Sequence, residues 1–238
     1  MLKLRTPALL ATLAAATVAC AGAASHAAPP VTDRIVVNDR VIDYSGPVTF
    51  DLIKRAQKQV LDFAAQGDEP IWFRVNSPGG SVDAGLILVD TIKSVKAPIH
   101  CVVESAAYSM AAIFLTYCDK RYALKHATIM LHEASYGMMG EDPSNRARHE
   151  FLTKYLDRMH VEIAGNIKMD VKKYRERIRD AWWLLTDEAL ASNIIDAVVR
   201  EMAYEETPLV KTEEKRVVTV TSERLEPTKG PAIPKRRD

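Results

Sequence analysis

A helical spacing of apolar side chains is clearest in the segment VTFDLIKRAQKQVLDFAAQ, residues 48–66. Apolar residues recur there every three or four positions, which places them along one face of a helix. They are Leu52, Ile53, Ala56, Val60, Phe63 and Ala64. Thr49 precedes the pattern and has the type of side chain that caps helix N-termini. The segment therefore predicts an amphipathic helix that begins just after Thr49.

Short apolar runs alternate with helical segments in the next part of the chain. Strand-like runs begin near residues 71, 98 and 127, with helical segments over residues 82–95 and 107–117 between them. A regular strand–helix–strand order is typical of parallel sheets that are covered by helices. The pattern predicts an α/β domain with a largely parallel sheet.

The character of the chain changes from Ser144 onward. Residues 145–167 form a long segment whose apolar side chains again follow a helical period. Those on one stripe are Phe151, Leu152, Tyr155, Met159 and Ile163. A long helix outside a compact α/β core often serves assembly, so we expect the region of about 144–168 to mediate self-association.

The first part of the chain reads as a secretory signal peptide, residues 1–27. Lys3 and Arg5 give it a basic start, residues 8–19 are uncharged and largely apolar, and small residues precede a cleavage position after Ala27. The apolar stretch is short for a membrane span, and a retained membrane anchor is the alternative. We expect export, to the periplasm.

Two further expectations concern the ends of the chain. Cys20 lies in a sequence that weakly resembles a bacterial lipidation box, so lipid anchoring is an alternative to a free exported protein. Residues 205–238 are polar and charged, which predicts a mostly disordered tail. One domain, residues 28–204, lies between the two ends.

Charge and cysteine content narrow the function classes. The 238-residue chain carries 32 Lys and Arg against 31 Asp and Glu, so its net charge gives no reason to expect nucleic acid or a membrane surface as a partner. Cys101 and Cys118 remain after the signal peptide is removed. In an oxidising compartment this pair is a disulfide candidate, and two buried free thiols are the alternative.

The turn NSPGGSV, residues 76–82, joins a predicted strand to a predicted helix. Gly79 and Gly80 lack Cβ atoms, so another group can approach their N–H groups closely, as in an anion site or an oxyanion hole. The glycine and lysine spacings of phosphate-binding and dinucleotide-binding loops are absent from this sequence, as are His-Glu-x-x-His and Cys-x-x-Cys metal motifs. We therefore expect neither a nucleotide cofactor nor a metal.

Ser109 and His132 are the candidates for nucleophilic catalysis. Ser109 follows a predicted strand and opens a predicted helix, while His132 ends the apolar run TIMLH. Strand ends of a parallel sheet meet at one edge, where a serine and a histidine can act as nucleophile and general base. Taken singly, a helix-start serine and a surface or core histidine are the ordinary alternatives.

These segments together resemble the Clp protease proteolytic subunit family. The turn NSPGGSV, the Ser-Met pair, the histidine strand, a helical insert and the closing LTDEALASNIIDAVV follow in the family's order, over residues 33–200. The resemblance implies a ClpP/crotonase-like spiral of βαβ units with a protruding helical handle. It also implies a homo-oligomeric, ring-forming serine peptidase with a Ser-His-Asp triad.

Site residues carry over from the resemblance one by one. Ser109 is similar to the family's nucleophile and His132 to its base. Gly80, with Gly79, and Met110 are similar to the backbone donors of its oxyanion hole. The helix over residues 145–168 is similar to the handle through which family rings stack.

Three departures from the family pattern matter. Tyr108 stands where a small residue is usual and could narrow the pocket. Asp180 is the nearest carboxylate to the family's third triad position, which one alignment gives to Ala181, and Asp170 is a more distant substitute. The export signal separates the chain from a cytosolic ATP-driven unfoldase.

The sequence thus predicts an exported serine endopeptidase that cuts peptides or unfolded segments without an ATPase partner. A catalytically weak or inactive scaffold that binds peptides is the alternative. Acyl-CoA chemistry, found among crotonase relatives, is disfavoured because CoA is cytosolic and would leave Ser109 and His132 without a purpose.

Overall fold

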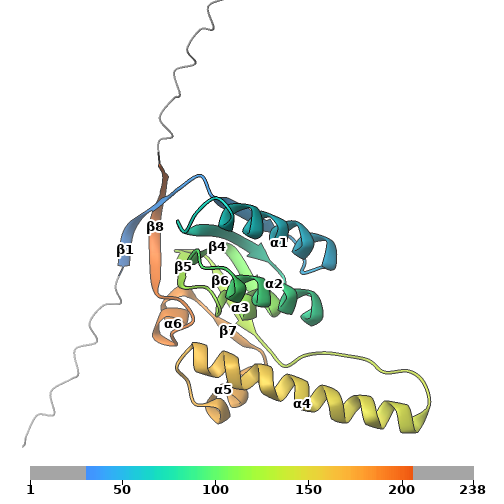
Figure 1. Ribbon diagram of the computed structural model, residues 1–238. Helices are drawn as coiled ribbons and strands as arrows, with labels where there is room; N and C mark the ends of the chain where they lie inside the picture. Colours follow the sequence, from blue (N-terminus) through green and yellow to red (C-terminus); the bar gives the residue numbers. More distant parts are fainter. Residues whose placement is uncertain (1–30, 206–238) are drawn as a thin grey trace, which may run out of the picture. The chain divides into compact units, whose positions relative to one another are not determined.

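The computed structural model describes residues 31–205, so the predicted signal peptide and nearly all of the predicted tail lie outside the described residues. These residues form eight strands in one sheet, with helices packed against it (Figure 1). The strands are β1 (Val31–Val37), β2 (Val41–Ser45), β3 (Ile71–Ser77), β4 (Ile99–Tyr108), β5 (Lys120–Leu124), β6 (Thr128–Leu131), β7 (Trp182–Leu184) and β8 (Ala197–Tyr204). The helices are α1 (Phe50–Ala64), α2 (Val82–Ser94), α3 (Met110–Leu115), α4 (Asp142–Asn166), α5 (Val171–Ile178) and α6 (Thr186–Ala191).

The sheet is largely parallel, as the strand–helix repeat predicts. Its order is β1-β8-β5-β4-β3-β2, and α1, α2 and α3 connect β2 to β5 in sequence. Only β6 and β7, among the described strands, pair antiparallel. The α/β fold class is confirmed. Thr49 caps α1 as predicted, because its side chain accepts a hydrogen bond from the backbone N–H of Leu52.

The main core lies between the sheet and helices α1, α2 and α3. Ile53 of α1, Phe73 of β3 and Leu88 of α2 are all fully buried there. Strand alternation sends Trp72 to the other face, into a smaller cluster with Val102 and residues of β1 and β8. The apolar run of β3 is explained by burial on both faces.

Strand β4 is longer than its sequence indicates. The sequence predicts a helix from residue 107, but β4 continues to Tyr108 and α3 begins at Met110. The reason is a change of neighbour: the first half of β4 pairs with β5, and Ala106, Ala107 and Tyr108 pair with β6. Tertiary pairing outweighs the weak strand preference of the alanines. Ser109 therefore lies at the very end of a strand.

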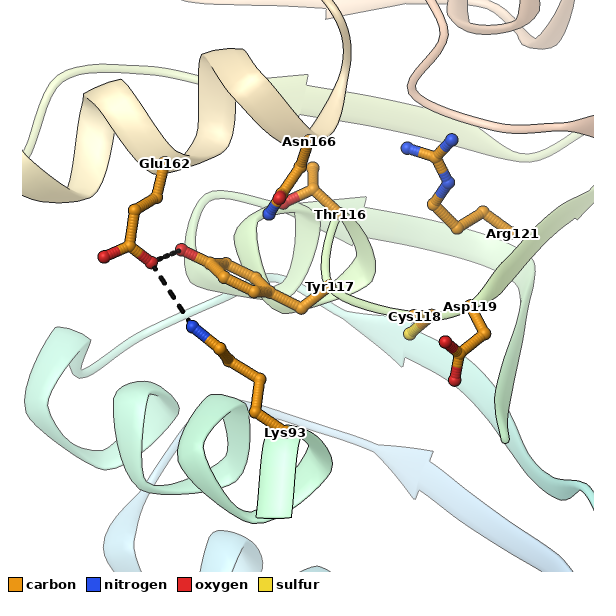
Figure 2. Close-up of a pocket in the computed structure, with 8 residues that line it drawn as sticks. All are labelled: Lys93, Thr116, Tyr117, Cys118, Asp119, Arg121, Glu162 and Asn166. Atoms are coloured by element: carbon orange, nitrogen blue, oxygen red, sulfur yellow. Dashed lines mark hydrogen bonds and ion pairs between the residues drawn. The ribbon is translucent and has the colours of Figure 1, made fainter. Parts of the chain in front are cut away.

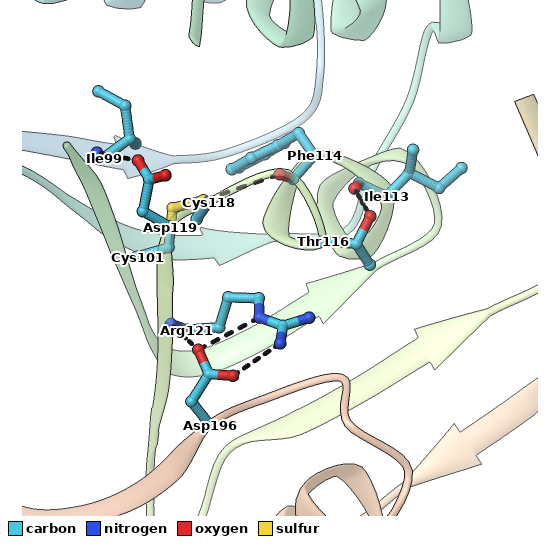
Figure 3. The surroundings of a disulfide bond; sticks show 9 residues. All are labelled: Ile99, Cys101, Ile113, Phe114, Thr116, Cys118, Asp119, Arg121 and Asp196. Carbon is cyan, nitrogen blue, oxygen red and sulfur yellow. Dashed lines mark hydrogen bonds and ion pairs between the residues drawn. A yellow bond between two sulfur atoms is a disulfide. The ribbon is translucent and has the colours of Figure 1, made fainter. Parts of the chain in front are cut away.

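A disulfide joins Cys101 of β4 to Cys118, just beyond α3 (Figure 3). The two Cα atoms are 6.0 Å apart, and both residues are buried. The bond closes a segment that contains Ser109 and Met110. Next to it, the carboxylate of Asp119 accepts a hydrogen bond from the backbone N–H of Ile99, which fastens the same corner of the sheet.

Removal of this disulfide is expected to lower the free energy of unfolding by about 3 kcal/mol, because cross-linking a loop of this length removes that much chain entropy from the unfolded state. The measurement is urea unfolding of the oxidised protein with and without a reductant. The variant Cys101→Ala/Cys118→Ala is the control and should not respond to the reductant. Equal stability with and without reductant in the unmutated protein would contradict the prediction.

Helix α4 is buried only in its second half. Its buried residues are Met159, His160, Ile163 and Ala164, whereas Phe151 is 63% exposed and stacks on Tyr155. The first half of α4 thus leaves the apolar side chain of Phe151 in solvent. None of the helices within residues 31–205 combines the length and the apolar character needed to span a membrane.

Candidate functional site

Ser109 has an unusual backbone conformation at the end of β4. Its φ is 53° and its ψ is −123°, a region that non-glycine residues seldom occupy. The backbone N–H of Ser109 donates a 2.7 Å hydrogen bond to the carbonyl of Met130, which continues the β4–β6 ladder. Strained residues of this kind concentrate at functional sites because the surrounding structure must hold them.

The same ladder brings His132 to Ser109. Tyr108 is aligned with Met130, so the chain leaving β6 passes beside the chain leaving β4. Nε2 of His132 lies 2.8 Å from Oγ of Ser109. When Nε2 is unprotonated it can accept the Ser109 proton, which is the arrangement of a nucleophile with its general base.

Gly79 packs directly against this serine turn. A Cβ atom at Gly79 would lie 2.4 Å from the carbonyl oxygen of Tyr108 and 2.7 Å from Cβ of Ser109, and the residue has a φ of 83°. Its own N–H donates to Oγ of the buried Ser77 at 3.2 Å. The N–H of Gly79 is therefore already engaged, and its role is to allow the close approach.

Gly80 and Met110 are the remaining backbone donors expected at an oxyanion hole. Their N–H groups take part in none of the turn and cap hydrogen bonds found within residues 31–205. Gly80 has no room for a side chain either, because an added Cβ would lie 2.5 Å from the carbonyl oxygen of Val48. These contacts fix the turn beside Ser109.

A cleft of about 260 Å³ lies between the glycine turn and the chain that follows His132. One wall comes from the start of α2, the other from the segment after β6, and α4 forms the floor. Its lining residues are Gly80, Ser81, Val82, Asp83, Ala134, Ser135, Tyr136, Arg148, Leu152, Tyr155 and Leu156. Ser109, His132 and Tyr108 are not among them. The hydroxyl of Tyr108 lies 2.7 Å from Thr128 Oγ1, and its ring packs edge-on against Trp183.

Comparison with known proteins identifies the family. Residues 15–202 match the Clp protease family. The chain belongs to this family. It is 33% identical to the ATP-dependent Clp protease proteolytic subunit 1 of Chlamydia muridarum (strain MoPn / Nigg) over 189 residues, which cover 75% of this chain and 95% of the relative. It is 30% identical to the ATP-dependent Clp protease proteolytic subunit of Streptococcus pyogenes serotype M5 (strain Manfredo) over 171 residues, 69% of this chain and 86% of the relative.

The structure of this Clp protease family member does not bring Asp180 to His132. Both Asp180 and Arg179 are 75% exposed and hydrogen-bond to each other, and this bond holds the pKa of Asp180 below its usual value. The chain reverses at Ala181, where φ is 63°, so Asp180 stays in solvent before β7 begins. Asp170 caps α5 by accepting from the N–H of Lys173. Within residues 31–205, Nδ1 of His132 has no hydrogen-bond partner.

Asp180→Asn is therefore expected to change peptide hydrolysis by less than about twofold, since an exposed ion pair contributes little and the carboxylate does not touch His132. Initial rates at saturating and low peptide concentrations provide the measurement. A loss of tenfold or more would show that Asp180 reaches His132 during turnover.

A second cleft, of about 450 Å³, lies among α2, α3 and α4 (Figure 2). Lys93 and the hydroxyl of Tyr117 both contact the carboxylate of Glu162, at 3.8 and 3.1 Å. Arg121, on another side, pairs with Asp196 at 2.6 Å. The cations of this second cleft are thus neutralised within the protein. The candidate active site is the Ser109–His132 pair, together with the smaller cleft that Gly80 of the neighbouring glycine turn lines. No group of three or more potential metal ligands occurs within the described part of the chain.

Glu133 and His160 lie beside the site, and no sequence motif gives either of them a role. Glu133 directly follows His132, and His160 lies on the buried stripe of α4 between Met159 and Ile163. Nε2 of His160 is 3.2 Å from Oε2 of Glu133. A polar residue on the apolar face of a helix was the available signal, since such residues need a buried partner.

Acid is expected to destabilise the protein partly through His160. Burial lowers the pKa of His160 from its ordinary 6.5, with Arg175 acting in the same direction and Glu133 and Asp157 opposing, while Tyr174 packs on the ring. The unfolded chain therefore takes up the proton first, so stability is full above about pH 6.5 and declines as the pH falls below it. Melting temperatures at pH 7.5 and 5.0 should differ less in His160→Gln than in the unmutated protein. The exposed His126→Gln is the control, and an equal shift in all three proteins would refute the prediction.

Proposed function

We propose that this protein is a serine endopeptidase that hydrolyses peptide bonds in peptides or unfolded segments. The observation that carries the proposal is the 2.8 Å approach of His132 Nε2 to Ser109 Oγ at a strained turn. Membership of the Clp protease family supports it. Ser109 is the proposed nucleophile and His132 the proposed base.

The proposed reaction uses groups that converge on this turn. Oγ of Ser109 attacks the peptide carbonyl while His132 takes its proton and later returns it to the leaving amine. The N–H groups of Gly80 and Met110 hold the oxyanion, and one such donor contributes about 3 kcal/mol to lowering the barrier. With Asp180 turned to Arg179, we propose that the protein works as a Ser109–His132 pair.

The cleft lined by Gly80 and by the chain after His132 is the proposed substrate site. Val82, Leu152 and Leu156 give it apolar surface for a substrate side chain. Asp83 and Arg148 add one charge of each sign at its wall. No cofactor takes part in the proposed hydrolysis.

We also propose that the protein is exported and works without an ATPase, unlike the ATP-dependent subunits it resembles. The segment over residues 1–27 supports export, and the Cys101–Cys118 disulfide fits an oxidising compartment such as the periplasm. The exposed apolar side chains of α4 support assembly into a ring-type homo-oligomer.

The test is hydrolysis of an unfolded, carboxymethylated protein by the purified chain without nucleotide. Cleavage that ATP does not change is expected. Cleavage that requires an added ATPase and ATP would contradict the independence from an ATPase, and a lack of any cleavage would contradict the peptidase itself.

A peptide-binding scaffold is the second candidate function. The observation that favours it is the missing carboxylate at His132 Nδ1, since a triad acid normally fixes the histidine tautomer. Stable oligomers that bind peptides but do not cut them would support the scaffold.

A further inference from the structure

Glu133 is held from two helices immediately after His132. His160 of α4 contacts its carboxylate at 3.2 Å, and Arg175 of α5 contacts it at 3.4 Å. Arg175 also pairs with Asp157 of α4, so the two helices and the chain leaving β6 are tied together. The carboxylate is about one-third exposed, while the side chain of His160 is 1% exposed.

His160 is an unusual residue to bury in this place. Within residues 31–205 neither of its ring nitrogens makes a hydrogen bond, although Nε2 lies 3.2 Å from the Glu133 carboxylate. Buried polar atoms are nearly always satisfied, so an exception in a folded protein calls for an explanation. A leucine here would avoid the cost but would leave Glu133 with Arg175 alone.

We propose that Glu133, clamped by His160 and Arg175, is a positioning residue that keeps the His132 imidazole on Ser109. The proposal rests on the peptidase function proposed above. Hereafter the three residues Glu133, His160 and Arg175 are called the Glu133 clamp. Restraining the side chain of Glu133 also restrains the backbone of the preceding residue, His132.

The need for such a clamp follows from the geometry of His132. In a triad an acid holds the second ring nitrogen, but no described residue binds Nδ1 of His132 here. Pairing of β6 with β4 and β7 ends at Leu131, so the ladder does not restrain the next residue. Glu133 supplies the following fixed point, two peptide bonds beyond the end of the strand. A misplacement of about 1 Å in a catalytic group can cost on the order of 100-fold in rate.

The test compares Glu133→Gln, His160→Leu and His160→Gln for the rate at which a fluorophosphonate labels Ser109. Glu133→Gln and His160→Leu are expected to slow labelling about tenfold. His160→Gln should stay within about threefold, because its amide can still donate toward Glu133. Glu176→Gln, which removes an exposed carboxylate from the same helix as Arg175, is the matched control and should label normally. Melting temperatures identify any variant that fails to fold. Because glutamine has nearly the same shape as glutamate, Glu133→Gln should fold and keep the test decisive.

A second readout does not depend on activity. The imidazole resonances of His132 in nitrogen-15 spectra should shift or broaden in Glu133→Gln and stay unchanged in Glu176→Gln. If the unmutated protein is not labelled, the peptidase proposal fails, and these spectra alone decide the clamp. The clamp proposal would be overturned if both Glu133→Gln and His160→Leu were labelled within twofold of the unmutated rate. It would also be overturned if the His132 resonances did not move in Glu133→Gln.

Discussion

Ser109→Ala is expected to lower kcat/KM for peptide hydrolysis by at least about 1000-fold. The alanine removes the hydroxyl oxygen that His132 Nε2 contacts, so no acyl-enzyme can form, and any residual rate comes from binding and the oxyanion donors alone. KM should change little, because the side chains of the cleft are untouched. The measurement is steady-state hydrolysis of a fluorogenic peptide.

The control for Ser109→Ala is Ser135→Ala, in the wall of the same cleft. Ser135 has no contact with His132 in the hydrogen-bond network of residues 31–205, so its loss should alter KM more than kcat. A Ser109→Ala protein that retains more than about a tenth of the activity would show that another residue attacks the substrate.

Gly79→Ala is expected to lower the free energy of unfolding by about 3 kcal/mol or more and to abolish activity. The new methyl group would lie 2.4 Å from the Tyr108 carbonyl oxygen and 2.7 Å from Cβ of Ser109, at a φ of 83° that alanine adopts only with strain. To make room, the serine turn must move, and Ser109 then leaves His132. Urea unfolding and peptide hydrolysis measure the two effects.

Gly165→Ala is the matched control for Gly79→Ala. A Cβ at Gly165, in α4, meets nothing within 4 Å and has no positive φ. The helix should gain up to about 1 kcal/mol from the better helix former. Equal stability of the Gly79→Ala and unmutated proteins would contradict the close packing of the glycine turn on Ser109.

The proximity of Ser109 and His132 could be predicted from the sequence, because it depends on the order of strands in the sheet. Both residues end strands, and ends of parallel strands meet at one edge of a sheet. The repeat of strands near residues 71, 98 and 127 was enough to expect this. Apolar periodicity also predicted the α4 helix, which begins at Asp142, within a few residues of the expected start.

Two features of the site could not be read from local patterns. Asp180 was the nearest carboxylate in sequence, but the positive φ of Ala181 turns the chain so that Asp180 stays with Arg179 in solvent. The serine turn was placed too early, because the pairing of Ala106 and Ala107 with β6 extends β4. The position of the serine turn depends on pairing with residues far away in the sequence, whereas that of Asp180 depends on a local backbone conformation that residue patterns do not indicate.

Reaction of the purified protein with a fluorophosphonate, followed by mass mapping of the adduct, tests whether Ser109 is the nucleophile and His132 its base. We expect one adduct, on Ser109, whose rate of formation falls by at least tenfold in His132→Ala, and no adduct in Ser109→Ala. An adduct on another residue, or labelling that persists in Ser109→Ala, would contradict it.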